Sequence, residues 1–175
     1  MEEYFLIRPT SEYASQIMEY RQEFLDAGDS MDGTGALRRT ADPEEYIRTS
    51  IEREDPKNVP KDLVPSTQFL FVRESDNRLV GMLQVRHCFN DYLEKYAGHI
   101  GYSVRPSERR KGYAKEMLKA ALPFCREIGL NRVLITCIDG NIGSEKTILA
   151  SGGVYESTVY EPNDNVDLKR FWITL

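Results

Sequence analysis

Hydrophobic residues recur along this chain with two different periods, and each period predicts a different kind of element. Short runs rich in aromatic and β-branched residues, bounded by Pro, Gly or polar turns, predict strands. They lie at residues 4–8, 68–73, 78–88, 98–105, 132–138, 154–160 and 166–175. Apolar residues spaced three or four apart predict helices at 11–27, 42–54, 109–128 and 141–150, with a shorter helical or irregular piece near 91–96.

Helix ends and breaks can also be predicted from single residues. Asp42 followed by Pro43 is typical of a helix start, and Gly152 with Gly153 is typical of a helix stop. Pro123 removes a backbone donor inside 109–128, so we expect a kink or a break there.

The predicted order is β-α-α-β-β-β-α-β-α-β-β, without an internal repeat or a low-complexity linker. The sequence therefore predicts one mixed α/β (α+β) domain over residues 1–175. We expect a central twisted mixed sheet of about 6–7 strands, flanked by about four helices.

The composition excludes several classes of protein. With 41% hydrophobic and 29% charged residues, the chain is not expected to be disordered. Its longest apolar stretches, such as residues 79–83, are far shorter than a membrane-spanning helix, and its N-terminus is acidic where a secretory signal would be basic. Three scattered cysteines and only two histidines, His87 and His99, do not support a metal site. We expect a cytoplasmic protein that binds neither membrane nor metal.

The net charge of −5 is unevenly distributed. Residues 1–66 carry 8 Lys/Arg against 15 Asp/Glu, whereas a basic cluster follows later in the chain. That cluster contains Arg105, Arg109, Arg110, Lys111, Lys115 and Lys119, opposed only by Glu108 and Glu116. The net acidity of the chain argues against nucleic acid as its partner.

The basic cluster surrounds a tight loop between a predicted strand and a predicted helix. Gly112 allows a ligand to approach the backbone closely, and Ala114 is small enough not to block it. Successive N–H groups at a helix start bind anions, so the loop suits a diphosphate. A turn with a solvated charged face is the alternative. Neither a P-loop nor a dinucleotide-binding glycine motif is present.

Arg109-x-x-Gly112-x-Ala114, placed after a strand and opening a helix, resembles the [Q/R]-x-x-G-x-[G/A] signature of the GNAT N-acetyltransferase superfamily. A second match is Asn141-x-x-Ser144 after the strand at 132–138, which resembles the family's N-x-x-[A/S] helix. The order of elements over nearly the whole chain is also similar to that of the family.

The resemblance implies that acetyl-CoA is the cosubstrate. The amides of residues 110–114 (Arg110, Lys111, Gly112, Tyr113 and Ala114) would cradle the pyrophosphate, with the Arg109 and Lys111 side chains nearby. Backbone groups of Tyr102, Ser103 and Val104 would pair with the pantetheine, and Asn141 would bond it from the other side, with Ser144 completing the motif. Asn141 also suits a helix N-cap, and both roles are compatible. The two strands beside the cofactor would be parallel neighbours that splay apart.

The implied reaction is acyl transfer to an amine in a ternary complex, which needs groups that move protons. Many family members place a Tyr seven residues after the Asn, but Ile148 occupies that position here, and Gly153 replaces the usual Phe. The nearest substitutes are His99, Tyr102 and Tyr155, each of which also suits a purely structural role.

The acceptor is expected to be an amine of a small molecule or peptide. The loop after the first helix carries Asp26, Asp29 and Asp32, with Glu44 and Glu45 beyond, so a cationic acceptor is one hypothesis and surface solubility is the other. Ile148 also leaves open a non-catalytic CoA-binding sensor as the alternative function. The β-rich C-terminus could pair across a homodimer, or its apolar residues could simply pack in the core.

Overall fold

The computed structural model describes residues 1–175, and its helices and strands lie close to the predicted positions. The strands are β1 Tyr4–Ile7, β2 Ser66–Arg73, β3 Arg78–Arg86, β4 Ile100–Val104, β5 Arg132–Ile138, β6 Val154–Glu161 and β7 Val166–Thr174. The main helices are α1 Ala14–Ala27, α2 Pro43–Glu52, α3 Tyr113–Glu127 and α4 Ile142–Ala150. The mixed α/β class predicted from the sequence is confirmed.

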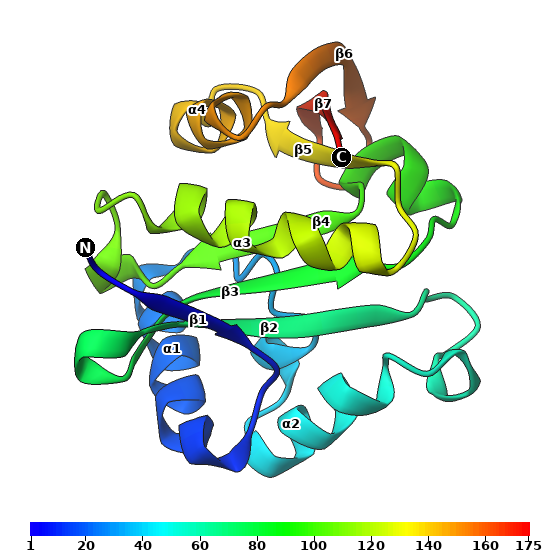
Figure 1. The fold of residues 1–175 in the computed structure, drawn as a ribbon. Helices are drawn as coiled ribbons and strands as arrows, with labels where there is room; N and C mark the ends of the chain where they lie inside the picture. The colour runs from blue at the N-terminus through cyan, green and yellow to red at the C-terminus, as the bar shows by residue number, and fades with distance from the viewer.

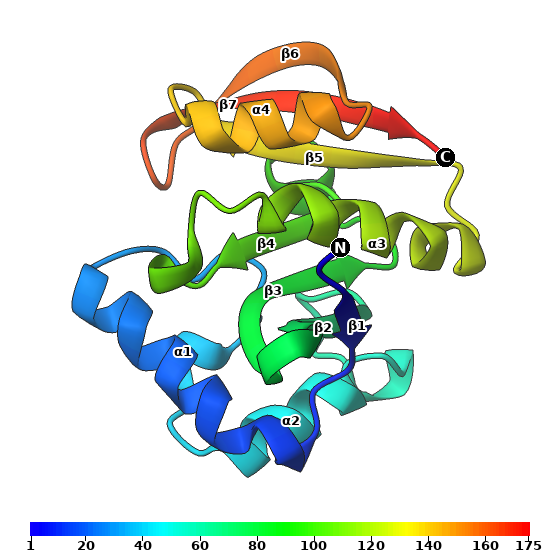
Figure 2. The same ribbon diagram turned by 60° about the vertical axis from the view of Figure 1, so that its left-hand side comes forward.

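The strands form two hydrogen-bonded sheets where the sequence predicted one. The first sheet has the order β1-β2-β3-β4 and is antiparallel throughout, and the second has the order β5-β7-β6. β4 and β5 run in the same direction (Figure 2) but are joined only near one end, by a backbone bridge from Gly98 to Ile135. The expected splaying is therefore confirmed, and it is wide enough to divide the sheet in two.

Helices cover both faces of the first sheet because its strands are apolar on both sides. Phe69 and Phe71 of β2 pack in one core with α3, whereas Leu70 and Val72 pack in a second core with α1 and α2. This alternation follows from the two-residue period of a strand. Figure 1 shows α3 on one side of β1–β4 and the blue and cyan helices α1 and α2 on the other.

Helix α3 starts later than the sequence predicts. Arg110 and Gly112 have φ angles of 63° and 83°, in the left-handed region, which interrupts the helical repeat, so the helix begins only at Tyr113. At the other end the predicted break is absent, since α3 continues through Pro123 as one helix to Glu127. The consequence is a longer loop between β4 and α3.

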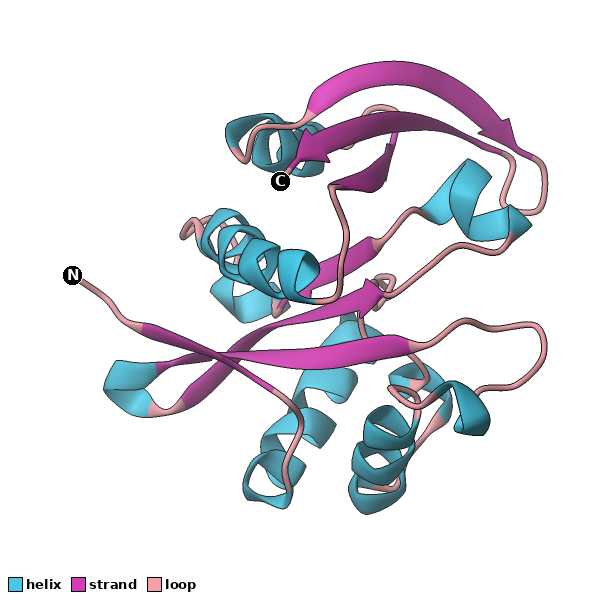
Figure 3. Cartoon of the chain, turned by 45° about the vertical axis from the view of Figure 1, so that its right-hand side comes forward, coloured by secondary structure: helices cyan, strands magenta, loops and turns pink.

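A short turn of π-helix, Leu93–Ala97, packs against the second sheet (Figure 3). The Thr136 hydroxyl donates to the Tyr96 carbonyl at 2.8 Å, and an Arg170 guanidinium N–H donates to the Lys95 carbonyl at 2.8 Å. This turn lies where an irregular helical piece was predicted. None of the helices combines the length and apolar character needed to cross a membrane.

Candidate active site

A cavity of about 510 Å³ lies where β4 and β5 separate, and we call it the splay cleft. It is lined from β4 by Ile100, Gly101 and Tyr102, from β5 by Thr136, Cys137 and Ile138, and from the start of α4 by Asn141 and Ser144. Three of the residues predicted to bind cofactor, Tyr102, Asn141 and Ser144, therefore come together in one cavity.

β4 presents unpaired backbone groups towards this cleft. The Arg86 N–H donates to the His99 carbonyl and the Arg105 N–H donates to the Val80 carbonyl, which fixes the phase of the β3–β4 ladder. In an antiparallel ladder alternate residues point their N–H and C=O away from the partner strand. Tyr102 and Val104 are in that phase, so their backbone groups face the open edge, as the predicted pairing with an extended ligand requires.

The loop after β4 forms a cradle of free amides. No backbone N–H of residues 109–115 donates to a backbone carbonyl, and the first internal bond at this end of α3 is the 3.3 Å bond from the Glu116 N–H to the Gly112 carbonyl. An added Cβ at Gly112 would meet no protein atom within 4 Å, so the space above the loop is open. Consecutive free amides at a helix N-terminus suit a phosphate group.

The cationic side chains around the cradle form ion pairs with neighbouring carboxylates. An Arg109 guanidinium nitrogen lies 2.7 Å from the Asp29 carboxylate, and the Lys111 ammonium lies 2.7 Å from the Glu108 carboxylate. Arg109 and Lys111 thus border the loop as predicted, but each is in an ion pair. Arg105 is buried and pairs with Glu19 and Glu23 of α1, so this member of the basic cluster faces away from a ligand.

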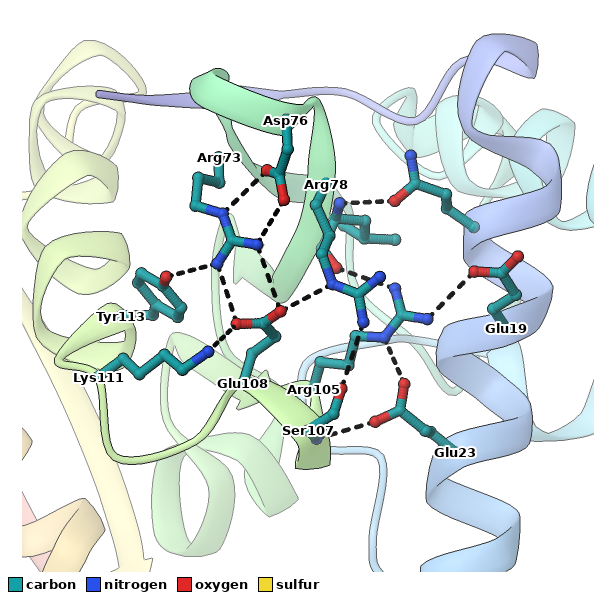
Figure 4. Close-up of polar contacts among 12 residues, drawn as sticks. Glu19, Glu23, Arg73, Asp76, Arg78, Arg105, Ser107, Glu108, Lys111 and Tyr113 are labelled. Atoms are coloured by element: carbon teal, nitrogen blue, oxygen red, sulfur yellow. Dashed lines mark hydrogen bonds and ion pairs between the residues drawn. The ribbon is translucent and has the colours of Figure 1, made fainter. Parts of the chain in front are cut away.

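Glu108 holds the loop in place from beneath (Figure 4). Its carboxylate is only 7% exposed and is bonded by Arg78 at 2.7 Å, Arg73 at 3.0 Å and Lys111 at 2.7 Å. Burial alone would raise its pKa, but these cationic hydrogen bonds outweigh burial and lower the pKa to about 2. The Tyr113 hydroxyl also accepts from Arg73, at 2.7 Å, which ties the first residue of α3 to the same cluster.

Two further predicted residues have well-defined partners. The Tyr102 and Ser144 hydroxyl groups are hydrogen-bonded at 2.8 Å, and burial raises the pKa of Tyr102 to about 12. Asn141 is the N-cap of α4, accepting from the Ser144 N–H at 3.2 Å, and it lines the cleft as well. Ser103 points to the opposite face of β4, where its hydroxyl bonds with that of Tyr20, so its side chain does not reach the cleft.

His99 joins the two sheets at the point where they begin to separate. Its N–H donates to the Leu134 carbonyl at 2.8 Å, and its Nδ1 accepts from the Leu134 N–H at 2.9 Å. Its ring lies against Phe89, and the residue is only 5% exposed. Burial, with the charges of Arg86 and Arg132, lowers its pKa to about 4. His99 does not line the cleft, so this geometry favours the structural role over the proton relay.

This position of His99 predicts a pH-dependent stability. Because the pKa falls from 6.5 in the unfolded chain to about 4 in the fold, the stabilisation is full above pH 6.5 and is lost as the pH falls towards 4. We expect the free energy of unfolding to fall by about 2–3 kcal/mol over that range. In His99→Asn, whose amide oxygen keeps an acceptor for Leu134, the decline should be smaller. Denaturant titrations of both proteins at several pH values measure it, and an equal decline in both would contradict the prediction.

Tyr155, the third proton-transfer candidate, lies outside the cleft, unlike Tyr102. The Tyr155 hydroxyl bonds with Thr158, and the residue is 52% exposed. Ile148, at the position of the family's usual Tyr, is fully buried in the core. An added Cβ at Gly153 would lie 2.5 Å from the Ile148 side chain, so the glycine fits against that isoleucine.

The loop between α1 and α2 reaches the cleft through close backbone packing. Gly33 has a φ of 72°, and an added Cβ there would lie 2.3 Å from the Gly101 carbonyl of β4. This contact brings Asp32 into the cleft lining, together with Glu161 and Asp164 from the β6–β7 turn. The other two aspartates are engaged elsewhere, since Asp26, which lies in the last turn of α1, bonds with Gln22 and Asp29 pairs with Arg109.

Sequence reasoning missed Glu108, Cys137 and Glu161. Glu108 stood out only as an acid within a basic run, and nothing local showed that Arg73 and Arg78 would reach it. Cys137 and Glu161 lie in segments that are apolar or turn-like in sequence and enter the cleft only through the way β5, β6 and β7 pack.

A mixed α/β fold with splayed β4 and β5, a row of amides without backbone partners and a cleft between the strands suits the binding of a phosphorylated ligand. The sequence matches the Acetyltransferase (GNAT) family over residues 36–149, more than half of the chain. The chain therefore belongs to the GNAT acetyltransferase family. No curated protein matches the sequence.

Solved structures of similar fold include several acetyltransferases. The ribosomal-protein-S5-alanine acetyltransferase from Vibrio fischeri has a TM-score of 0.73 at 17% identity, covering 99% of this chain and 94% of that one. The microcin C7 self-immunity acetyltransferase MccE, in complex with acetyl-CoA and AMP, has a TM-score of 0.71 at 18% identity, with 99% and 93% covered. RimL, a ribosomal L7/L12 α-N-protein acetyltransferase in complex with coenzyme A, has a TM-score of 0.71 at 14% identity, with 98% and 94% covered.

Proposed function

We propose that this acetyltransferase transfers the acetyl group of acetyl-CoA to a primary amine by direct attack within a ternary complex in the splay cleft. The observation that carries the proposal is that the open edge of β4 at Tyr102 and Val104 leads along the chain from the cleft, which Tyr102 lines, to the amide cradle at 109–115. The cradle binds the pyrophosphate, and the strand edge pairs with the pantetheine. The acetyl thioester that acetyl-CoA supplies then lies near Tyr102 and Asn141.

Cys137 is the one thiol in the cleft lining, and it favours direct transfer over an acetylated enzyme. Burial raises its pKa to about 11, so it remains a protonated thiol at neutral pH. The thiolate is the nucleophilic form of cysteine, so Cys137 is a poor acyl carrier. The amine nitrogen therefore attacks the thioester carbon itself, forming the C–N bond as the C–S bond breaks.

Tyr102 is the best placed group to protonate the departing thiolate. Its hydroxyl lies in the cleft, bonded to Ser144, and a pKa of about 12 keeps it protonated over the working pH range. The amine also loses a proton, and Asp32 and Asp164 are the exposed carboxylates of the cleft lining that can take it up. The Glu161 carboxylate is buried, and its two oxygens accept from the Asn163 and Asp164 N–H groups.

The acceptor class follows from the same carboxylates. Three acids and one arginine, Arg86, line the cleft, a balance that attracts an ammonium group before it is deprotonated. The acceptor is then the amine of a small molecule or of a peptide. Of the five acidic residues on which the cationic-acceptor hypothesis was based, only Asp32 lines the cleft.

Initial-rate kinetics test direct transfer. Free thiol released from acetyl-CoA is measured while acetyl-CoA and a primary-amine peptide are both varied. A ternary complex gives double-reciprocal lines that intersect, whereas parallel lines would indicate an acetyl-enzyme. Cys137→Ala should retain the intersecting pattern. Binding of CoA without any thiol release across a broad amine panel would favour a non-catalytic sensor and contradict the proposal.

Tyr102→Phe should lower kcat by about 100-fold while changing the KM for acetyl-CoA by less than about threefold, because only proton donation is lost. Steady-state rates at pH 7–9 measure both constants. Tyr155→Phe distinguishes the two tyrosines, since its hydroxyl bonds outside the cleft. A loss of kcat in Tyr155→Phe with an unchanged Tyr102→Phe would reassign the acid to Tyr155.

A further inference from the structure

A second cavity of about 400 Å³ lies beside the splay cleft, between α2, the ends of β2 and β3, and residues 90–97. Arg86, Tyr92 and Ala97 line both cavities, so the two adjoin each other. The charged side chains of this second cavity are Arg39, Arg53, Arg86 and Asp62, and we call it the arginine cavity. Its charge is opposite in sign to that of the acid-lined cleft.

The arginines of this cavity form no direct ion pair within the protein. None of Arg39, Arg53 and Arg86 is within salt-bridge distance of a carboxylate, in contrast to Arg73, Arg78, Arg105 and Arg109 near the cradle. Arg86 bonds only to carbonyls, those of Ala97 at 3.4 Å and Gly98 at 3.2 Å, and Arg53 bonds to the Asn58 carbonyl at 3.2 Å. Arg53 and Arg86 are half-buried and Arg39 is exposed. Guanidinium groups that form no ion pair suit an anionic ligand.

The lining also contains a buried acceptor with no partner. Gln68 is 3% exposed, and its Nε2 donates to the Gly33 carbonyl at 2.7 Å, but its Oε1 has no hydrogen bond. Gly35, also in the lining, lies beside this oxygen, since an added Cβ there would be 3.6 Å from it. A buried oxygen without a donor is costly, which points to a ligand N–H or O–H at this position.

We propose that the arginine cavity binds an anionic group, a carboxylate or a phosphate, of the same acceptor whose amine lies in the splay cleft. This proposal rests on the proposed function and specifies its substrate class. The acceptor carries an amine and an anion a short distance apart, with a hydrogen-bond donor between or beside them. A peptide with an acidic side chain near its N-terminus has this chemistry, and so does a small aminoalkyl phosphate.

Binding measurements with matched probes test the cavity directly. In the presence of saturating CoA, the protein is titrated calorimetrically with the peptides Ala-Glu-Ala-NH₂ and Ala-Gln-Ala-NH₂, and with phosphoethanolamine and ethanolamine. We expect at least one anionic probe to bind about tenfold more tightly than its neutral partner, as one charge-assisted hydrogen bond provides. The pair that shows the preference distinguishes a peptide carboxylate from a phosphate.

Two substitutions on α2 test whether Arg53 causes the preference for the anionic probe. Arg53→Gln should reduce it to less than about twofold. Arg48→Gln, an exposed arginine on the same helix that does not line the cavity, should leave the preference unchanged. In the wild-type protein the Nε–Hε NMR signals of Arg53 and Arg86 should shift with the anionic probe, a readout that does not depend on a variant folding.

Two results separate this proposal from the proposed function. Equal binding of both members of each pair, with no arginine signal shifting, would overturn the anion site while leaving acetyl-CoA turnover intact. Failure to bind CoA would instead overturn the proposed function. The same titrations without CoA would still report on the cavity.

Discussion

Replacing Gly112 by valine should raise the dissociation constant of CoA by about 1,000-fold. Gly112 has a φ of 83°, which a β-branched residue does not tolerate, and the space above it is open to a ligand. The variant rearranges the cradle and places a side chain where the pyrophosphate would lie. Loss of two charge-assisted hydrogen bonds at about 2 kcal/mol each corresponds to that change in affinity.

Gly129→Val is the matched control for this prediction. Gly129 has a φ of 91° and also has open space around it, but it lies just beyond the far end of α3. The backbone strain is similar, and Gly112 is about 25 Å away along the helix. Calorimetric titration with CoA should give nearly wild-type affinity for Gly129→Val. Equal affinity losses in both variants would show that the effect is general destabilisation and that the pyrophosphate lies elsewhere.

Glu108→Gln should lower the free energy of unfolding by about 3–5 kcal/mol. The substitution removes the buried negative charge that neutralises Arg73, Arg78 and Lys111, and an uncompensated buried charge cluster is strongly destabilising. Urea denaturation at pH 7 measures the loss. Glu54→Gln, which breaks the more exposed pair with Arg8, should cost less than about 1 kcal/mol. Similar losses in the two variants would contradict the role of Glu108 as the anchor of the loop.

The lowered pKa of Glu108 predicts how acid destabilises the wild-type protein. Its pKa is lowered from 4.5 to about 2, so its contribution is full above pH 4.5 and is lost as the pH falls towards 2. The contribution amounts to about 3 kcal/mol. Glu108→Gln should lack this part of the acid-induced decline, which denaturation at pH 7, 4.5 and 3 would show.

The cradle and the order of elements could be predicted from the sequence because their signals are local. The Gly after a strand, the basic run and the Asn helix cap are each recognised from a few neighbouring residues. Each strand is likewise recognised from the pattern within its own segment. Apolar spacing predicts that this helix begins at residue 109, which is too early. The spacing does not show that Arg110 has a left-handed conformation.

The separation of the sheet and the acceptor side of the site depend on contacts that are distant in sequence. Nothing within residues 98–105 or 132–138 shows that they meet only at one end, through Gly98 with Ile135 and His99 with Leu134. In the sequence, His99 suits a catalytic base and a structural link between strands equally well. Glu108 is bonded to Arg73, 35 residues earlier in the chain, and Arg86 lines two cavities that are built from segments far apart in the sequence. Such pairings are set by tertiary packing, which a single sequence does not specify.

The most direct test of the cofactor site is an NMR titration of the ¹⁵N-labelled protein with CoA. We expect the largest amide shifts at residues 109–115, whose N–H groups have no backbone acceptor, with smaller shifts at Tyr102, Val104 and Asn141. Saturable binding that shifts these amides in wild-type protein and not in Gly112→Val would confirm the cradle. Shifts confined to other residues, or none at all at millimolar CoA, would contradict it.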